Sequence, residues 1–235
     1  MATAHQHEYS FFRVIKDNTI ASSAKKYKEL RLQALYTAPA SFSSTYKIES
    51  SLADTEWVER LSANGKETFI CAATPLQTST SSEDDQSRRW VGQLTLRGPL
   101  CAEDFILPEE SGQTYNPAET SDQDQDKELW QMLSLFTLPD HRGKGLGKRL
   151  CQEALSYLTS YKHFPREVCV RLMVKPENHA TVALYRGLGF ADAGKCTLAE
   201  ALVANGDKEL LPENISGEKY TSRSGLIMML EICRS

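Results

Sequence analysis

The chain has 235 residues, 40% of them hydrophobic, which is enough to bury a full core in one domain. The net charge of −4 argues against a general nucleic-acid-binding protein, because such proteins are usually basic. No apolar run is long enough to span a membrane, and residues 1–16 lack the pattern of a signal peptide, so we expect neither a membrane partner nor secretion.

The cysteines show no C-x-x-C spacing, so the sequence predicts neither a zinc site nor a disulfide framework, and no metal is expected. They are Cys71, Cys101, Cys151, Cys169, Cys196 and Cys233. Free thiols persist in reducing compartments. We therefore expect a cytoplasmic protein, with the nucleus as the alternative.

The N-terminal part of the sequence predicts a strand, then two helices with a loop between them. Residues 9–16 are rich in aromatic and β-branched residues, which is typical of a strand. Apolar residues recur at close to 3.6 positions through residues 20–36, which predicts an amphipathic helix that Pro39 ends. Residues 40–50 are predicted to form a polar loop, and a second helix is predicted over residues 54–63.

Two strands are predicted next, over residues 67–74 and 89–97. The stretch 75–88 between them is rich in Ser, Thr, Asp and Glu, which predicts a mobile hairpin loop. The stretch 98–127 is predicted to be disordered or a surface excursion. Its acidic run has two interpretations, a solvated loop or a patch that steers a cationic substrate, and both stay open.

A buried strand is predicted over residues 129–138, because its Trp, Met, Leu and Phe residues leave no continuous polar face. Pro139 ends this strand, since proline cannot donate to a sheet. A glycine-rich turn follows and leads into a helix. The apolar face of that helix consists of Leu146, Leu150, Ala154 and Leu158, spaced four residues apart.

The C-terminal third predicts a strand over residues 166–175, a helix over 179–188, the start of a strand at 190–193 and a last strand over 225–233. A strand, a helix and a strand in this order predict a parallel pair, and the whole order predicts an α+β protein with a mixed sheet. The stretch 195–224 is an insertion with a weak helical pattern. It is predicted to be a lid or an oligomer contact, and the sequence does not decide between them.

The turn before the central helix has the composition of an anion site. Glycines let the backbone approach a ligand, and the free N–H groups at a helix start favour phosphate. The spacing does not fit a P-loop, because Lys148 is followed by Arg149 and not by Ser or Thr, and it does not fit the dinucleotide fingerprint either. The pattern is R-x-x-G-x-G, as Arg142-Gly143-Lys144-Gly145-Leu146-Gly147.

A second group of residues lies further along the chain. Asn178 and Tyr185 are seven residues apart, which places both on one face of the predicted helix, and Gly189-Phe190 follows. Together with R-G-K-G-L-G, and with L-R-L-Q-A-L-Y-T-A-P-A-S-F at residues 30–42, this order resembles the GNAT family of N-acetyltransferases. The resemblance covers about residues 9–194 and the last strand.

The resemblance implies one GNAT domain over residues 1–235, with polar insertions at about 75–88, 98–127 and 195–224. Its fold would be a mixed, mostly antiparallel sheet flanked by helices, in which the parallel strands four and five splay apart. Acetyl-CoA would be the co-substrate, with its arm along the fourth strand and its pyrophosphate on the glycine loop. The implied contacts are Leu135, Phe136, Thr137, Leu138, Arg142, Gly143, Lys144, Gly145, Leu146, Gly147, Lys148, Asn178 and Tyr185.

The implied reaction moves the acetyl group from the thioester directly to an amine. The N–H of Phe136 or of a neighbour would stabilise the negative oxygen of the tetrahedral state. Tyr185 would be the general acid that protonates the leaving thiolate, although a core aromatic is the other interpretation of this residue. Asn178 is interpreted as a helix N-cap, a contact to CoA, or both.

The general base is the point at which the sequence departs from the family. Members that acetylate histone lysine carry a Glu where this chain has Gln131, and an amide does not take a proton. Glu128 is a candidate base, and His163 and His179 are further candidates. The base therefore stays open.

Two function classes remain for the chain. The first is an N-acetyltransferase for a small amine, an amino acid or a protein amine, acting as a monomer or a homodimer without nucleic acid. The second is a catalytically weak acyl-CoA-binding or regulatory module on the same fold, because a fold does not fix a function.

Overall fold

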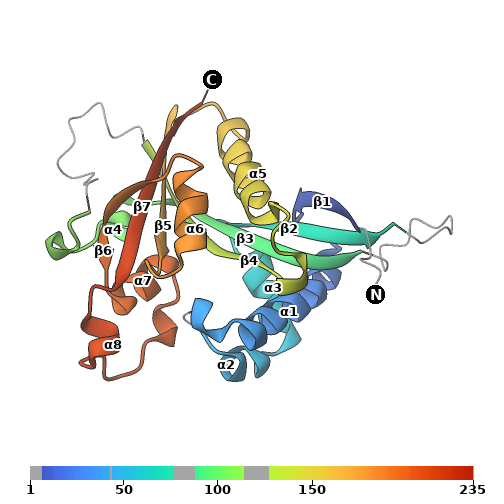
Figure 1. Ribbon diagram of the computed structural model, residues 1–235, viewed down its shortest axis with the longest axis horizontal. Helices are drawn as coiled ribbons and strands as arrows, with labels where there is room; N and C mark the ends of the chain where they lie inside the picture. Colours follow the sequence, from blue (N-terminus) through green and yellow to red (C-terminus); the bar gives the residue numbers. More distant parts are fainter. Residues whose placement is uncertain (1–6, 43, 77–87, 114–126, 235) are drawn as a thin grey trace. The chain divides into compact units, whose positions relative to one another are not determined.

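The computed structural model describes residues 7–42, 44–76, 88–113 and 127–234 (Figure 1). The described strands form one mixed sheet with the order β1-β2-β3-β4-β5-β7-β6. The strands are β1 (His7–Arg13), β2 (Lys66–Pro75), β3 (Arg89–Leu100), β4 (Lys127–Thr137), β5 (Glu167–Val174), β6 (Ala191–Cys196) and β7 (Gly225–Cys233). The predicted mixed sheet is therefore confirmed.

The chain divides into two compact units. The first consists of Met1–Thr95 and Ser134–Ala154, and the second of Leu96–Leu133 and Leu155–Ser235. Strands β3 and β4 and helix α5 (Leu146–Ser160) contribute residues to both units. The single domain implied by the sequence stays a prediction.

The first unit contains the predicted N-terminal helices. Helix α1 (Ile20–Thr37) ends before Pro39, as predicted, and helix α3 (Asp54–Ser62) follows the predicted range closely. Strands β1 and β2 pair antiparallel, from His7↔Pro75 to Arg13↔Phe69. The core of this unit includes Leu30 and Leu35 of α1, Trp57 of α3 and Ile70 of β2, all nearly inaccessible to solvent.

The predicted loop at residues 40–50 is wrong in part, because it contains the short helix α2 (Tyr46–Ser50). The side chain of Thr45 caps α2 by accepting a hydrogen bond from the Ile48 N–H at 3.3 Å. Glu49 on this helix is fully buried beside two arginines. The helix thus depends on partners from other segments. A helix of five residues is too short to show a hydrophobic period, so the sequence pattern does not reveal it.

In the second unit, β7 lies between β5 and β6 and pairs antiparallel with both (Figure 1). Strand β5 confirms the strand predicted over residues 166–175, and both of its faces are buried, including the side chain of Arg171. An apolar cluster fills this unit. Its buried members are Phe105, Leu129, Cys169, Ala193, Cys196, Ile227 and Met229.

Two of the predicted polar insertions contain regular structure. Strand β3 runs to Leu100 and helix α4 (Ala102–Phe105) follows, where Phe105 is fully buried, so the prediction of disorder is wrong there. Residues 114–126 of that insertion, and 77–87 of the predicted hairpin loop, lie outside the described residues. In the last insertion, helix α7 (Leu198–Asn205) starts with a capping box of Thr197 and Glu200, and helix α8 (Glu218–Thr221) follows.

Strands β4 and β5 pair in parallel, as the strand–helix–strand order predicts, from Lys127↔Glu167 to Gln131↔Arg171. The splay beyond this register stays a prediction. The apolar stripe predicted for α5 is confirmed, because Leu146, Leu150, Ala154 and Leu158 are all buried. Among the described residues, no helix combines the length and the apolar character that a membrane crossing requires.

Candidate active site

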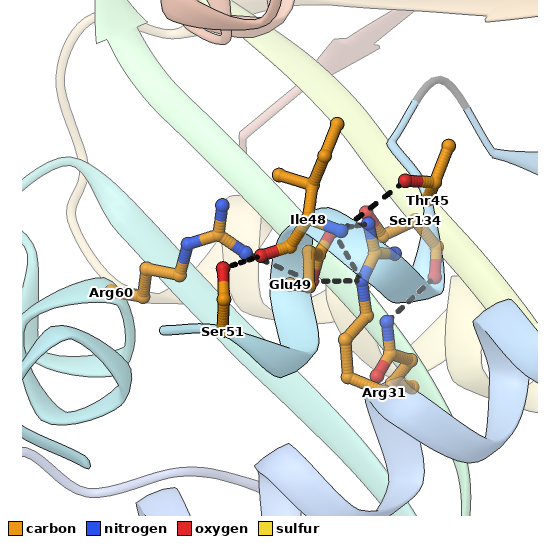
Figure 2. A network of polar contacts seen from close by, with 8 residues as sticks. Arg31, Thr45, Ile48, Glu49, Ser51, Arg60 and Ser134 are labelled. Carbon is orange, nitrogen blue, oxygen red and sulfur yellow. Dashed lines mark hydrogen bonds and ion pairs between the residues drawn. The ribbon is translucent and has the colours of Figure 1, made fainter. Parts of the chain in front are cut away.

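Strand β4 changes conformation at Ser134, just before the predicted acetyl-CoA contacts. Ser134 has φ +57°, a conformation that residues other than glycine adopt only when their neighbours hold it. The buried side chain of Gln93 donates to the Ser134 carbonyl at 3.5 Å, and Figure 2 shows this carbonyl at the edge of a polar network. The residues implied to hold the arm of acetyl-CoA follow directly.

The last of those residues, Leu138, already has backbone partners within the first unit. Its N–H donates to the Val91 carbonyl at 2.8 Å, and its carbonyl accepts from the His141 N–H at 3.0 Å. Leu138 therefore has no N–H to offer a ligand. We expect Leu135, Phe136 and Thr137 to make the backbone contacts that the sequence assigned to this stretch.

The glycine loop has the backbone that its sequence predicts for a close ligand. Gly143 and Gly145 have φ +74° and +73°, in the left-handed region, and no other atom would lie within 4 Å of an added Cβ. The two glycines are thus needed for backbone conformation and not for packing. Helix α5 begins at Leu146, so its first N–H groups and the positive end of its dipole lie at this loop.

The basic side chains of the loop are held against neighbouring residues. Arg142 folds back onto β4, where its Nε donates to the Thr137 carbonyl at 3.0 Å and its guanidinium lies 5.5 Å from the Phe136 ring. The Lys144 Nζ donates to the Tyr9 hydroxyl at 2.9 Å. Lys148 is exposed. The positive charge predicted for this loop is present, and two of its carriers are anchored.

Tyr9 connects Lys144 to a buried histidine. The Tyr9 oxygen lies 3.0 Å from Nδ1 of His141, and the ring of His7 lies 5.1 Å from that of His141. Burial lowers the pKa of His141, and the nearby charges of His7, Lys144 and Arg89 lower it further. A neutral His141 with its proton on Nε2 accepts the Tyr9 O–H, so Tyr9 is left to accept from Lys144. The sequence did not predict this series of contacts, because the residues that form it are up to 135 positions apart.

A buried ion pair also supports this unit, as Figure 2 shows. Glu49 accepts two hydrogen bonds from Nε and Nη2 of Arg31, at 3.0 and 2.7 Å, and a third from Arg60 at 3.0 Å. Burial acts to raise the pKa of Glu49, but the hydrogen bonds and charge of Arg31 and the charge of Arg60 outweigh it and lower the pKa. Arg31 also lies 4.5 Å from the ring of Phe42, whose ring is 5.6 Å from that of Phe136. The ion pair thereby fixes aromatic side chains beside the end of β4.

The second unit holds Asn178 and Tyr185 on helix α6 (His179–Arg186). Asn178 caps the helix, since its side chain accepts from the Thr181 N–H at 3.4 Å. It is also exposed, so the N-cap leaves room for the predicted contact to CoA. The Tyr185 ring is 6% exposed and packs 5.7 Å from that of Phe190. Tyr185 is thus a core aromatic, and its role as the general acid stays a prediction.

Glu128, the candidate base, is the centre of a buried polar cluster. Arg234 donates to its carboxylate at 2.8 Å, and Lys162, Tyr161 and Trp130 contact the same carboxylate. Burial acts to raise the pKa of Glu128, but hydrogen bonds from these four residues lower it below the ordinary value. A carboxylate with a lowered pKa and four partners is a poor proton acceptor, so we infer a structural role for Glu128.

Gln131 is also engaged at both ends of its amide. Its oxygen accepts from Nε of Arg171 at 2.8 Å, and its nitrogen donates to the side chain of Asn205 on α7 at 2.8 Å. The other candidate bases, His163 and His179, are exposed. The structure therefore does not identify the general base. Among the described residues, no group of three or more His, Cys, Asp or Glu side chains is placed to hold a metal ion.

These elements agree with known acetyltransferases in sequence and in fold. Residues 114–190 match the sequence model of the acetyltransferase (GNAT) family, while a comparison with curated protein sequences found no match. The segment contains β4, the glycine loop, α5, β5 and α6. The predicted resemblance to the GNAT family is thus confirmed.

Several solved structures share the fold across nearly the whole chain. The phosphinothricin acetyltransferase from Sinorhizobium meliloti, in complex with acetyl-CoA, is 15% identical with a TM-score of 0.53 and covers 96% of this chain and 89% of its own. A GNAT acetyltransferase from Streptococcus pneumoniae is 12% identical (TM-score 0.54; 96% and 100% covered). NAA60 from Arabidopsis thaliana, with a bisubstrate analogue, is 13% identical (TM-score 0.50; 97% and 100% covered). The chain has the GNAT acetyltransferase fold.

Gly145→Ala should weaken CoA binding about tenfold, because alanine disfavours φ +73° by about 1–2 kcal/mol, so the free loop relaxes and binding has to restore this conformation. Isothermal titration with CoA measures the change. Gly217→Ala is the matched control, since Gly217 has φ −67° and likewise has no atom within 4 Å of an added Cβ, and it should bind CoA as the unsubstituted protein does. If Gly145→Ala also binds CoA normally, the loop assignment is wrong.

Glu128→Gln should lower the free energy of unfolding at pH 7 by about 3 kcal/mol, because it leaves Arg234 buried without an opposing charge. The folded pKa of Glu128 is lowered, so its stabilisation is complete above the unfolded pKa of about 4.3 and is lost as the pH falls through the folded value. Urea unfolding at pH 7 and at pH 3 should therefore show a smaller difference from the unsubstituted protein at pH 3.

Glu153→Gln is the control for this change. Glu153 forms an exposed pair with Arg149 at 3.9 Å, so its loss should alter the free energy of unfolding by less than about 0.5 kcal/mol. Equal stabilities of Glu128→Gln and Glu153→Gln at pH 7 would contradict the role assigned to Glu128.

Proposed function

We propose that the chain is an acetyl-CoA-dependent N-acetyltransferase that moves an acetyl group directly to an amine. The observation that carries the proposal is the loop at residues 142–147, with two left-handed glycines at the start of α5, inside the segment that matches the GNAT family. Support comes from proteins of the same fold that were solved with acetyl-CoA or with a bisubstrate analogue.

In the proposed reaction, the neutral amine nitrogen attacks the thioester carbonyl and the carbon–sulfur bond then breaks. The N–H of Phe136, or of a neighbour on β4, donates to the oxygen that becomes negative. Ser134 changes the direction of the strand just before this point and the ring of Phe136 is fixed by Phe42 and Arg142, so the donor is held in one orientation. A preorganised donor costs little reorganisation in the transition state.

The reaction needs two proton transfers, and this chain offers a candidate residue for only one of them, the protonation of the leaving thiolate. Tyr185 is the proposed donor to the leaving CoA thiolate, and Asn178 is the proposed CoA contact at the start of the same helix. An alkylamine with a pKa near 10 must lose a proton before it attacks. Neither Glu128 nor Gln131 is suited to accept that proton, so we infer that water or the acceptor's own equilibrium supplies the neutral amine.

The second candidate function is a catalytically weak acyl-CoA-binding or regulatory module. It is favoured by Gln131, whose amide stands where some family members carry a glutamate base and has both ends in hydrogen bonds. For either function we infer a cytoplasmic protein, with the nucleus as the alternative, that acts as a monomer or a homodimer. The acceptor we propose is a small-molecule or peptide amine.

Incubation of the purified chain with acetyl-CoA and a panel of small amines, amino acids and peptides tests the proposal. We expect free CoA thiol to appear faster than by hydrolysis alone with at least one acceptor class, with a mass increase of one acetyl group on that acceptor. CoA binding without release for any acceptor would favour the second function. A chain that does not bind CoA would contradict both.

Tyr185→Phe should lower kcat by about 100-fold, because the leaving thiolate loses its proton donor, while the Kd for CoA changes less than twofold. Stopped-flow thiol release and CoA titration give the two values. Tyr36→Phe is the control, because the Tyr36 side chain is 76% exposed, and it should keep full activity. Equal kcat values for the two variants would remove Tyr185 from the mechanism.

A further inference from the structure

Arg171 of β5 is a fully buried cation that has no anionic partner among the described residues. Its Nε donates to Gln131 and its Nη1 donates to the side chain of Gln113 at 3.0 Å and to the Phe105 carbonyl. The Phe105 ring lies 4.2 Å from the guanidinium carbon. The remaining nitrogen, Nη2, is buried and has no hydrogen-bond partner within the described ranges. Its N–H groups are therefore available to an acceptor.

The surroundings of Arg171 do not neutralise its charge. All three acceptors around it are neutral, and the described carboxylates form no ion pair with it. Burial raises the pKa of Cys169 and Cys196 to about 12 and 11, so these neighbouring thiols are neutral at pH 7. Burial, with a smaller contribution from the charge of Arg97, lowers the pKa of Arg171 to about 10, so the guanidinium stays protonated at pH 7.

The other buried charges of this protein are treated differently. Glu49 faces Arg31 and Arg60, and Glu128 faces Arg234 and Lys162. A buried charge without a counter-charge is strongly destabilising, because solvation is lost and nothing replaces it. Arg171 is therefore suited to an anionic partner other than the residues that the structure describes.

We propose that Arg171 is the centre of an anion site that takes a carboxylate group, with Nη2 as the donor. Gln131 leaves the positive charge of Arg171 in place. Its amide oxygen holds Nε of Arg171 and its amide nitrogen is turned to Asn205, so the guanidinium is oriented but not neutralised. A glutamate at position 131 would pair with Arg171 and cancel the charge. Gln131 thus leaves β4 without a general base at this position, and it also leaves Arg171 on β5 with its positive charge.

Two helices, α4 and α7, lie next to this site, and both are held by buried apolar side chains as well as by hydrogen bonds. The last turn of α7 is attached through the Asn205 side chain to Gln131 and through the Ala204 carbonyl to Arg97, at 2.9 Å. The four-residue helix α4 supplies Phe105. A carboxylate would reach the buried Nη2 through a local opening of these helices, so its binding is coupled to that opening.

The carboxylate has two sources, a free small acid or the acceptor itself. The second source rests on the proposed function, and it assigns the substrate class as an amine that also carries a carboxylate, such as an amino acid. Two measurements separate the sources. The first needs no acetyl transfer, so it stands even if the proposed function fails.

The first measurement is the thermal unfolding midpoint of the protein at increasing concentrations of sodium acetate. Equal concentrations of uncharged acetamide are the control, and a bulky sulfonate salt keeps the ionic strength constant. Acetate should raise the midpoint saturably, by about 4 °C at ten times its Kd, and acetamide should not. Arg171→Gln and Gln131→Glu should abolish the rise. Gln131→Glu keeps the arginine and the side-chain volume, so it remains informative if Arg171→Gln does not fold.

Lys195→Gln is the matched control, because it removes an exposed positive charge from the same unit and should keep the full acetate response. The absence of a saturable response in the unsubstituted chain would overturn the anion site. An equal response in Gln131→Glu and in the unsubstituted chain would also overturn it, since that result places the acetate elsewhere.

The second measurement compares kcat/KM for an amino acid and for its carboxamide as acceptors. The kcat/KM of the amino acid divided by that of the carboxamide should be at least tenfold higher in the unsubstituted chain than in Gln131→Glu. Comparing this ratio between the two proteins cancels the intrinsic reactivities of the two amines. Equal ratios overturn the acceptor as the source. If neither acceptor is acetylated but acetate still stabilises the chain, the transferase proposal fails and the anion site stands.

Discussion

A charge that leaves water must be neutralised by its neighbours, and this constraint organises both units of the protein. In the first unit, Glu49 holds α1, α2 and α3 together through Arg31 and Arg60, and so fixes Phe42 beside Phe136. In the second unit, Glu128 on β4 binds Arg234, next to the end of β7, and Lys162, after α5. Each carboxylate has a lowered pKa because its cations outweigh the effect of burial. Arg171, whose partners among the described residues are all neutral, is the exception, and it is where we propose that a carboxylate binds.

Strand β4 connects this electrostatic framework to the proposed chemistry. Its first residues carry Glu128 and Gln131, which are both engaged in structural contacts, and its last residues lead through Ser134 to the backbone proposed to hold the thioester. The glycine loop follows with Gly143 and Gly145 in the left-handed region, and Arg142 and Lys144 are anchored to β4 and to Tyr9. A residue that stabilises the strand is unsuited to take a proton in each cycle, because its proton affinity is set by its partners. Glu128 and Gln131 are therefore unsuited as the general base, while the glycine loop remains the proposed site of CoA binding.

The same reasoning connects the family match to what distinguishes this chain. The fold and residues 114–190 agree with GNAT acetyltransferases, while identities of 12–15% to the solved structures leave the acceptor undetermined. Helix α7 in the insertion reaches Gln131 through Asn205, so a segment outside the family pattern shapes the surroundings of a position within it. A sequence motif does not encode such contacts between the sheet and an insertion.

The sequence by itself determined the features that repeat along the chain. The periodicity of α1, the stripe of Leu146, Leu150, Ala154 and Leu158, and the glycine spacing at 143 and 145 are local patterns, and the structure agrees with each. Helices α2 and α4 were missed because they are too short for a period and exist through the burial of Glu49 and Phe105. Glu128 and Arg234 are 106 residues apart, and Arg171 meets Gln113 across 58. Only the tertiary structure decided these pairs, because the free energy of a buried charge depends on which residues surround it in space and not on which precede it in the chain.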